Sequence, residues 1–376
     1  VSCQGAPARY VRFLRPVLHS GTAYRSPATQ DLEKRTKILE RSCPTMDITD
    51  SKLFKHAYGC LAGVAVGDAM GMPSSLMTPC EIRSQIGRIE WFLPAPEGHY
   101  IHDGLAAGST TDDTAQTLAV AQAVISDKGK VVPESVAREI LAWAESIGAL
   151  EEGALVLGPS SMRALSLLKK GVPAAEAGKF GETNGAPMRI SPMGIINAGD
   201  LAGALDDTEL CCLPTHGTSV AISGAAAVSC GIAKALACPE SIEEIVDAAV
   251  RGAEQGATRG RVVAAPSIAK RIQWAVDLAL AEDSEDAACE VLYDLVGTTV
   301  ATTETVPIAF ALFVLADGDP MKTAILAANL GGDCDTIGAI ACSIAGAYSG
   351  ITAFPDEAVQ IVEEVNGLDL KGVTIE

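Results

Sequence analysis

The sequence predicts an all-α protein, and three observations carry that prediction. Apolar residues recur at three- and four-residue spacings along most of the chain after residue 50, and no stretch shows the alternation typical of strands. Hydrophobic residues are 48% of the chain but aromatic residues only 4%, so Ala, Val, Leu and Ile form most of the core. The 36 glycines favour helices that pack closely. Because only short turns separate the helical patterns, we expect residues 46–376 to form one domain, a single large orthogonal helical bundle.

The first strong helix is expected to begin at Ser51 and to end before Pro73. Its glycines recur every four residues and therefore line one face: Gly59, Gly63, Gly67 and Gly71. Each costs about 1 kcal/mol relative to Ala in a helix, so we expect another backbone, or a ligand, to approach that face closely. Asp68 lies in the same segment. It is either a hydrogen-bonded core or helix-end acid, or a functional residue that acts as a ligand or accepts a hydrogen bond from a substrate hydroxyl.

Residues 74–107 are predicted to form an irregular loop with one short helix near 79–87. His99 and His102 fall in this loop, and we expect them to be exposed rather than ligands. The segment Asn184-Gly185 before Pro187 is expected to turn, and Arg189 beyond it either grips a phosphate or pairs with an acid. Further helices are predicted at 112–126, 133–147, 159–170, 173–178, 192–205, 206–213, 219–237, 240–256, 266–282, 284–297, 304–316, 319–329, 335–349 and 355–366.

Two short acidic motifs open helices that are far apart in the chain: GSTTDDT at 108–114 and GGDCDT at 331–336. Alone, the first is equally well explained as a capped helix start. Carboxylates this close repel one another and stay ionised cheaply only near a cation or in water, yet both helices are apolar and expected to be buried. Such oxygen donors suit Mg²⁺, Mn²⁺ or Ca²⁺ rather than zinc, and four carboxylates argue for two ions in a central cleft. The predicted ligands are Thr111, Asp112, Asp113, Asp333, Asp335 and Thr336.

Composition restricts the possible partners and the compartment. The formal net charge of −19 argues against nucleic acid as a partner. Residues 57–72, 219–237 and 337–353 resemble membrane spans superficially, but they are rich in Ala and Gly and are predicted to be buried core helices, so no membrane partner is expected. The 11 cysteines show no zinc-binding spacing and are expected to be reduced thiols of a cytosolic-type compartment, with Cys334 a buried bystander.

Residues 1–45 differ from the rest of the chain. They carry 8 Lys or Arg and 3 Asp or Glu, and Met46 directly precedes the first helical pattern. We expect an N-terminal extension that is disordered or processed, with organelle import as one reading and upstream sequence before a natural start at Met46 as the other. Either reading predicts that a chain starting at Met46 keeps its stability and activity.

Together these residues resemble the ADP-ribosylglycohydrolase family over about residues 53–368. The resemblance rests on the glycine helix and both acidic motifs, and on GPSSMRAL at 158–165, TNGAPMRISPMGI at 183–195 and THGTSVAISGAAAV at 215–228. It implies an all-α fold with two Mg²⁺ or Mn²⁺ ions, held by the six predicted ligands. It also implies hydrolysis of the bond at the ribose anomeric carbon. The residues it places beside the ADP-ribose are Asn184, Gly185, Met188 and Arg189.

One position departs from the family pattern. Members that cleave ADP-ribosyl proteins often carry a glutamate where this chain has Ser75, and serine cannot act as a general acid at neutral pH. Asp112 and Asp113 are the predicted catalytic residues, with Glu182 and Glu304 as further candidates for the acid. Asp68 and Ser75 are predicted to lie beside the substrate.

The expected substrate is an ADP-ribosyl-arginine, a free ADP-ribose conjugate or a smaller riboside such as a nucleoside, and Ser75 favours the last two. The chain could also be a non-catalytic, crystallin-like member of the same fold, although intact ligands in both motifs argue against that. A metal-dependent phosphohydrolase is a third class, which no phosphate-cradling glycine loop supports.

Overall fold

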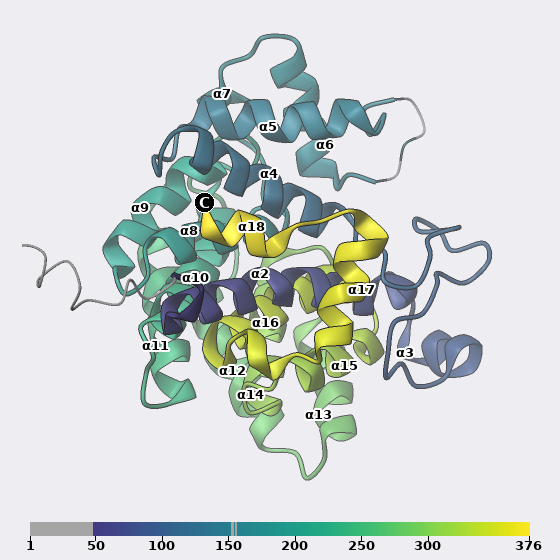
Figure 1. Cartoon of the computed structure of the whole chain (residues 1–376). Helices are drawn as coiled ribbons and strands as arrows, with labels where there is room; N and C mark the ends of the chain where they lie inside the picture. The colour runs from purple at the N-terminus through teal and green to yellow at the C-terminus, as the bar shows by residue number, and fades with distance from the viewer. Residues whose placement is uncertain (1–47, 152–153, 155) are drawn as a thin grey trace, which may run out of the picture. The chain divides into compact units, whose positions relative to one another are not determined.

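Helices α2 (Lys52–Gly71) and α16 (Cys334–Ser349) pack against each other along their small-residue faces (Figure 1). The computed structural model describes residues 48–151, 154 and 156–376 of the chain. A Cβ atom on Gly59, Gly63, Gly67 or Gly71 would collide with backbone atoms of 334–351. The glycine stripe of α2 therefore admits a second backbone, the first of the two alternatives that the sequence left open.

The part of the chain that the structure describes is helical, with a few isolated β-bridges and no strands. Before the first acidic motif lie the 3₁₀ turns Ile48–Asp50 and Met72–Ser74, helix α3 (Pro79–Glu81) and the π-helical turn Ile82–Ile86. The helices up to residue 236 are α4 (Asp112–Ser126), α5 (Pro133–Ser146), α6 (Pro159–Lys169), α7 (Ala174–Ala177), the 3₁₀ turn Pro187–Arg189, α8 (Ser191–Ile196), α9 (Leu201–Cys212) and α10 (Ser219–Leu236).

The remaining helices are α11 (Ile242–Gly256), α12 (Ile268–Leu280), α13 (Glu285–Val291), the π-helical turn Leu292–Val296, α14 (Thr302–Leu315), α15 (Pro320–Leu330), α16, the 3₁₀ turn Ile351–Ala353, α17 (Asp356–Asn366) and α18 (Leu370–Ile375). These bounds confirm the all-α prediction. Residues 48–376 form one compact unit, whereas the predicted extension 1–45 lies outside the described residues.

One predicted boundary is wrong. The sequence analysis divided the segment 192–213 at residue 205, but the chain breaks at 197–200, between α8 and α9. Gly199 has φ +81°, a conformation that favours glycine, and the Asp200 side chain accepts from the Gly203 N–H at 3.0 Å to cap α9. The predicted helix 284–297 has the expected bounds, although its last turn widens to a π-helix. Helix α18 was not predicted.

Helix α10 lies in the centre of the largest group of buried apolar side chains, among α8, α9, α11, α14 and α16. Among the described residues it is the one helix long and apolar enough to cross a membrane, and 94% of it is buried inside the protein, as expected for a core helix. Helices α5, α6 and α7 lie together at the top of Figure 1, and α17 and α18 pack on α2.

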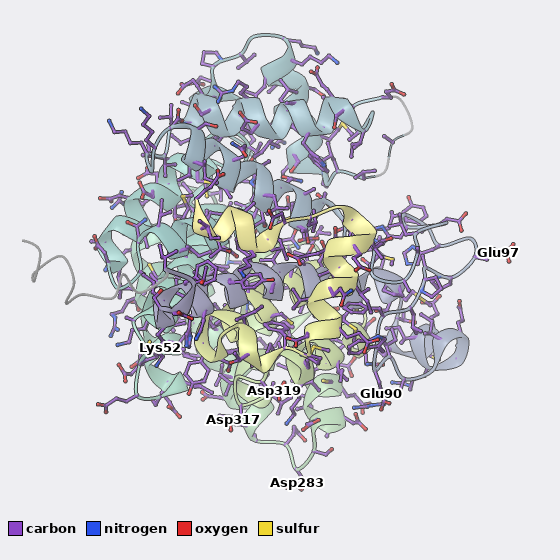
Figure 2. The ribbon with its side chains drawn as sticks, in the orientation of Figure 1. Lys52, Glu90, Glu97, Asp283, Asp317 and Asp319 are labelled. Atoms are coloured by element: carbon purple, nitrogen blue, oxygen red, sulfur yellow. The ribbon has the colours of Figure 1, made fainter. Side chains whose placement is uncertain are left out.

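Many charged side chains lie on the outside of this helical unit, whereas those of the acidic motifs are buried. Figure 2 labels six exposed examples: Lys52, Glu90, Glu97, Asp283, Asp317 and Asp319. Five of the six are acidic, in keeping with the net charge of −19. The cysteines among the described residues carry free thiols. Cys334 is one of them, and burial raises its pKa to about 12, as expected of an unreactive bystander.

Candidate active-site cleft

The two acidic motifs meet at the N-termini of α4 and α16. The hydroxyls of Thr336 and Thr111 both donate to the same oxygen of Asp113, Oδ2, at 3.3 Å and 3.0 Å. Asp112, Asp333, Asp335 and Thr336 line one cleft of about 320 Å³. The structure thus brings together the six predicted ligands, which come from segments more than 200 residues apart in the chain.

Asp68 holds the first motif in place. It is fully buried, and its carboxylate accepts from the Thr111 N–H at 2.9 Å and 3.1 Å and from the N–H and hydroxyl of Thr114 at 3.1 Å and 2.5 Å. It does not line the cleft. These are the contacts of a hydrogen-bonded core acid, which was one of the two readings of this residue.

Asp335 is held by two side chains that the sequence did not connect to it. The Ser75 hydroxyl donates to Oδ1 at 2.7 Å, and His102 Nε2 lies 2.9 Å from Oδ2. An antiparallel bridge between Met77 and Gly332 fixes the segment of Ser75 beside the second motif. Ser75 is buried against Asp335 and does not line this cleft, although it was predicted to lie beside the substrate.

The prediction that His99 and His102 are exposed loop residues is wrong. The His102 side chain is only 11% exposed and lines the cleft. His99 is also buried, its ring stacks on that of His102 at a centroid distance of 5.2 Å, and its Nδ1 accepts from the backbone N–H groups of Ile101 and His102. The loop therefore folds onto the acidic site, and no regular spacing in the sequence signals that contact.

The turn 183–188 forms another wall of the cleft. Asn184 donates from Nδ2 to Asp333 Oδ2 and to the Thr305 hydroxyl. Asn184, Gly185 and Met188 line the cleft, as expected for residues beside a substrate. A Cβ on Gly185 would lie 2.7 Å from the His216 ring, so only glycine fits there.

Arg189 does not line the cleft. It is fully buried and donates to Gln116 Oε1 at 2.5 Å and to the Thr215 hydroxyl. Gln116 Nε2 in turn donates to Asp112 Oδ2 at 2.8 Å. Because a guanidinium can only donate, it fixes the orientation of the Gln116 amide toward Asp112. Arg189 thus orients Asp112 through Gln116. In this structure it neither faces a phosphate site in the cleft nor pairs directly with an acid, which were the two predicted roles. The i, i+4 spacing of Asp112 and Gln116 could have signalled part of this network.

Burial and mutual repulsion dominate the electrostatics of the acidic cluster. Burial, followed by the neighbouring carboxylates, raises the pKa of Asp113 and of Asp333 well above the usual value. Burial and the charge of Asp335 raise the pKa of Asp112 to about 7, and burial raises that of Asp68 to about 6. Burial acts in the same direction on Asp335, but the hydrogen bond and charge of His102 outweigh it and lower that pKa.

The donor chemistry of the cluster fits a hard divalent cation. Asp113 Oδ1 is buried and has no hydrogen-bond partner, and a cation would satisfy it. A cation would also offset the repulsion that raises these pKa values. As the side chains are placed, no three His, Cys, Asp or Glu groups among the described residues are arranged around one common ion. The ligand set is therefore supported by its chemistry, and the structure defines no coordination geometry.

The two glutamates considered as alternative acids lie outside the cleft lining. Glu182 is exposed. Glu304 accepts from the N–H and hydroxyl of Thr299 at 2.9 Å and 2.6 Å, and so stabilises the chain before α14. Of the four candidates for the catalytic acid, Asp112 is the one that lines the cleft. Asp113 is buried and does not line it.

Comparison with known proteins shows the family of the chain. The model of the ADP-ribosylglycohydrolase family matches residues 49–374. The chain is 38% identical over 316 residues to the uncharacterised protein YegU of Escherichia coli, covering 84% of this chain and 94% of that protein. It is 24% identical over 338 residues to the ADP-ribosylarginine hydrolase Tri1 of Pseudomonas putida, and this match covers 86% of this chain and 78% of Tri1.

A solved structure described as an ADP-ribosylglycohydrolase-related protein complex shares the fold. The TM-score between the two structures is 0.62 and their sequences are 22% identical. The match covers 86% of this chain and 97% of the chain in the solved structure. The fold and site thus define a hydrolase of glycosidic bonds. The chain belongs to the ADP-ribosylglycohydrolase family.

Proposed function

We propose that this protein is a Mg²⁺- or Mn²⁺-dependent hydrolase that cleaves a ribosyl glycosidic bond, ADP-ribosyl or related, at the anomeric carbon. The observation that carries the proposal is the meeting of the two acidic motifs in one cleft, with Asp112, Asp333 and Asp335 facing the same space. Family membership supports the reaction type. The ADP-ribosylarginine hydrolase activity in the name of Tri1 supports an ADP-ribosyl compound as one substrate class.

The residues of this chain have separable tasks in such a reaction. Thr111, Asp112, Asp113, Asp333, Asp335 and Thr336 would hold the two ions, which when bound would supply Lewis acidity and an activated water. The carboxylates that line the cleft, those of Asp112, Asp333 and Asp335, would stabilise the positive charge that develops at the anomeric carbon. Asn184 orients Asp333, Gln116 orients Asp112, and Ser75 with His102 orients Asp335.

The proposal is tested by product analysis with Mg²⁺, with Mn²⁺ and with EDTA, on ADP-ribosyl-arginine, ADP-ribose and nucleosides. Asp112→Ala and Asp333→Ala should abolish release of the free sugar product and keep the helical circular dichroism, because each removes a charged ligand. Glu182→Ala, which changes an exposed acid outside the lining, is the matched control.

Either alanine variant at wild-type turnover in Mg²⁺ would contradict the metal assignment. Release of phosphate in place of free sugar would favour a phosphohydrolase, and the absence of any product would favour a non-catalytic member of the fold.

A further inference from the structure

A second cavity lies outside the candidate active-site cleft, between residues 78–88, residues 286–294 and the last turns of helix α15. Its volume is about 720 Å³, against about 320 Å³ for the cleft, and the two linings share no residue. Helix α15 contributes apolar side chains to it, of which Leu326 and Leu330 are buried. The proposed hydrolysis uses none of the residues that line this cavity.

Both π-helical turns in the described part of the chain border this cavity. The turn Ile82–Ile86 contributes Arg83, and the turn Leu292–Val296 contributes Tyr293 and Asp294. Turns of this kind are rare, and they occur frequently at functional sites. Their meeting at one cavity favours a binding role for it.

The charged groups of the cavity come from two different segments. Arg83 and Arg88 belong to the first segment, and the acids Asp286, Glu290 and Asp294 belong to the second. Arg88 and Asp286 lie 3.4 Å apart and form an exposed ion pair. No ion pair or hydrogen bond engages the other three side chains among the residues that the structure describes. Arg83 therefore offers one free positive charge, and Glu290 and Asp294 offer two free negative charges.

We propose that this cavity is a regulatory site for a basic amino acid, a small molecule with one carboxylate and two cationic groups. The guanidinium of Arg83 binds the carboxylate through paired hydrogen bonds. Glu290 and Asp294 hold the two cationic groups, and the methylenes between these groups pack on the apolar side chains of α15. Such a ligand complements the free charges of the cavity one for one.

The walls of the cavity also hold the backbone of the second acidic motif. The Gly332 N–H donates to the Met77 carbonyl at 2.8 Å, immediately before the lining residues of the first segment. The Asp333 N–H donates to the Thr298 carbonyl at 2.7 Å, just after the π-helical turn of the second segment. Each wall segment is therefore continuous with a backbone contact to this motif.

Two glycines separate the cavity from the first carboxylate of that motif. Leu330 lines the cavity, and Gly331 and Gly332, with φ of +89° and +83°, lead from it to Asp333. A Cβ on Gly331 would lie 2.7 Å from Pro79 Cδ, so the lining contacts this junction directly. A ligand that fixes both wall segments also fixes the backbone that carries Asp333, and it tightens metal binding there. This coupling rests on the proposed function, whereas binding of the amino acid does not.

Binding is measured first, on the full-length protein in EDTA, by thermal unfolding and by calorimetry with L-lysine, L-ornithine and L-arginine. Two analogues of L-lysine each lack one charge: L-norleucine has no side-chain ammonium, and cadaverine has no carboxylate. Each analogue should bind about 10-fold more weakly than L-lysine, because each loses one charge-assisted contact. No stabilisation by any of the three basic amino acids at about 10 mM, or equal affinities for L-lysine and both analogues, would overturn the proposal.

Variants locate the binding in this cavity. Arg83→Ala should weaken L-lysine by about 10-fold and leave cadaverine unchanged, because cadaverine has no carboxylate for the guanidinium to bind. Glu290→Gln should weaken both L-lysine and cadaverine. The controls Arg251→Ala and Glu254→Gln, at exposed positions of α11 outside the lining, should change neither affinity. Equal effects of Arg83→Ala and Arg251→Ala, or an equal loss of L-lysine and cadaverine in Arg83→Ala, would count against the site.

The regulatory role is tested by Mg²⁺ titration calorimetry with and without saturating L-lysine. Mg²⁺ should bind about 5-fold more tightly in the presence of L-lysine, and this effect should disappear in Arg83→Ala and persist in Glu254→Gln. An unchanged Mg²⁺ affinity, with L-lysine bound, would overturn the regulatory role. Failure of the proposed function gives a different result: the protein then binds no Mg²⁺ at all, while the measurements in EDTA still decide whether the amino acid binds.

Discussion

Replacing Asp68 by alanine tests whether this residue acts on the substrate or on the site. In the structure its carboxylate accepts from two backbone N–H groups, of Thr111 and Thr114, and from the Thr114 hydroxyl. Asp68→Ala leaves these donors without a partner at a position with no access to water. The first turn of α4, which carries Asp112 and Asp113, then loses its anchor to α2.

The expected cost follows from the number of donors stranded. Each buried unsatisfied donor costs about 1–3 kcal/mol, and the two N–H groups cannot rotate to find another acceptor, which gives about 2–6 kcal/mol. Removal of a carboxylate whose burial raises its pKa to about 6 offsets part of this loss at neutral pH. We therefore expect Asp68→Ala to lower the free energy of unfolding by about 2–4 kcal/mol. Asp68→Asn, which keeps one acceptor oxygen, should cost about half as much.

Urea denaturation at pH 7.5 followed by circular dichroism measures this quantity, and Mg²⁺ titration calorimetry on the same variants reports the metal site. Both variants should also bind Mg²⁺ more weakly, because the first motif is no longer fixed. A free energy of unfolding within about 0.5 kcal/mol of wild type, combined with lost activity, would refute the reasoning and make Asp68 a direct substrate contact.

Three further outcomes are expected. Gly63→Ala should lower the free energy of unfolding by about 1–3 kcal/mol despite the better helix propensity of Ala, because the new Cβ would collide with the Cys342 carbonyl. The control Lys55→Ala, at an exposed position of the same helix, should change that free energy by less than about 0.5 kcal/mol. Equal urea midpoints for the two variants would contradict the packing argument. Ser75→Ala should weaken Mg²⁺ binding by about 10-fold or more, and an unchanged calorimetric affinity would argue against Asp335 as a ligand. Burial holds the pKa of His216 well below its usual value, so as the pH falls the unfolded chain binds this proton before the folded chain does, and the free energy of unfolding decreases below about pH 6.5. His216→Gln should therefore reduce the dependence of that free energy on pH between about pH 5 and 6.5. The same pH dependence in the wild type and in His216→Gln would exclude His216 as its cause.

Local chemistry in the sequence was enough to predict several features. The four-residue glycine spacing predicts a helix face that another backbone approaches, because side-chain size is a local property, and α16 lies there. The Asp112-Asp113 pair and the Asp333-Cys334-Asp335 motif predict a shared acidic site, because in both motifs the repulsion between neighbouring carboxylates is relieved by a bound cation. The small-residue composition predicts close helix packing and the all-α class.

Tertiary structure alone decided what each polar side chain touches. Arg189 and Asp68 read as substrate contacts in the sequence, yet the fold directs them to Gln116 and to the backbone of the first motif. His102 reached Asp335, 233 residues away, through an irregular loop without periodicity. The absence of Lys and Arg from the described lining residues is likewise invisible in a chain with 28 Lys and Arg, because it depends on which of these side chains the packing directs away from the cleft. A pattern in sequence reports what a residue can do, whereas burial and long-range contact determine which of those chemistries remains available.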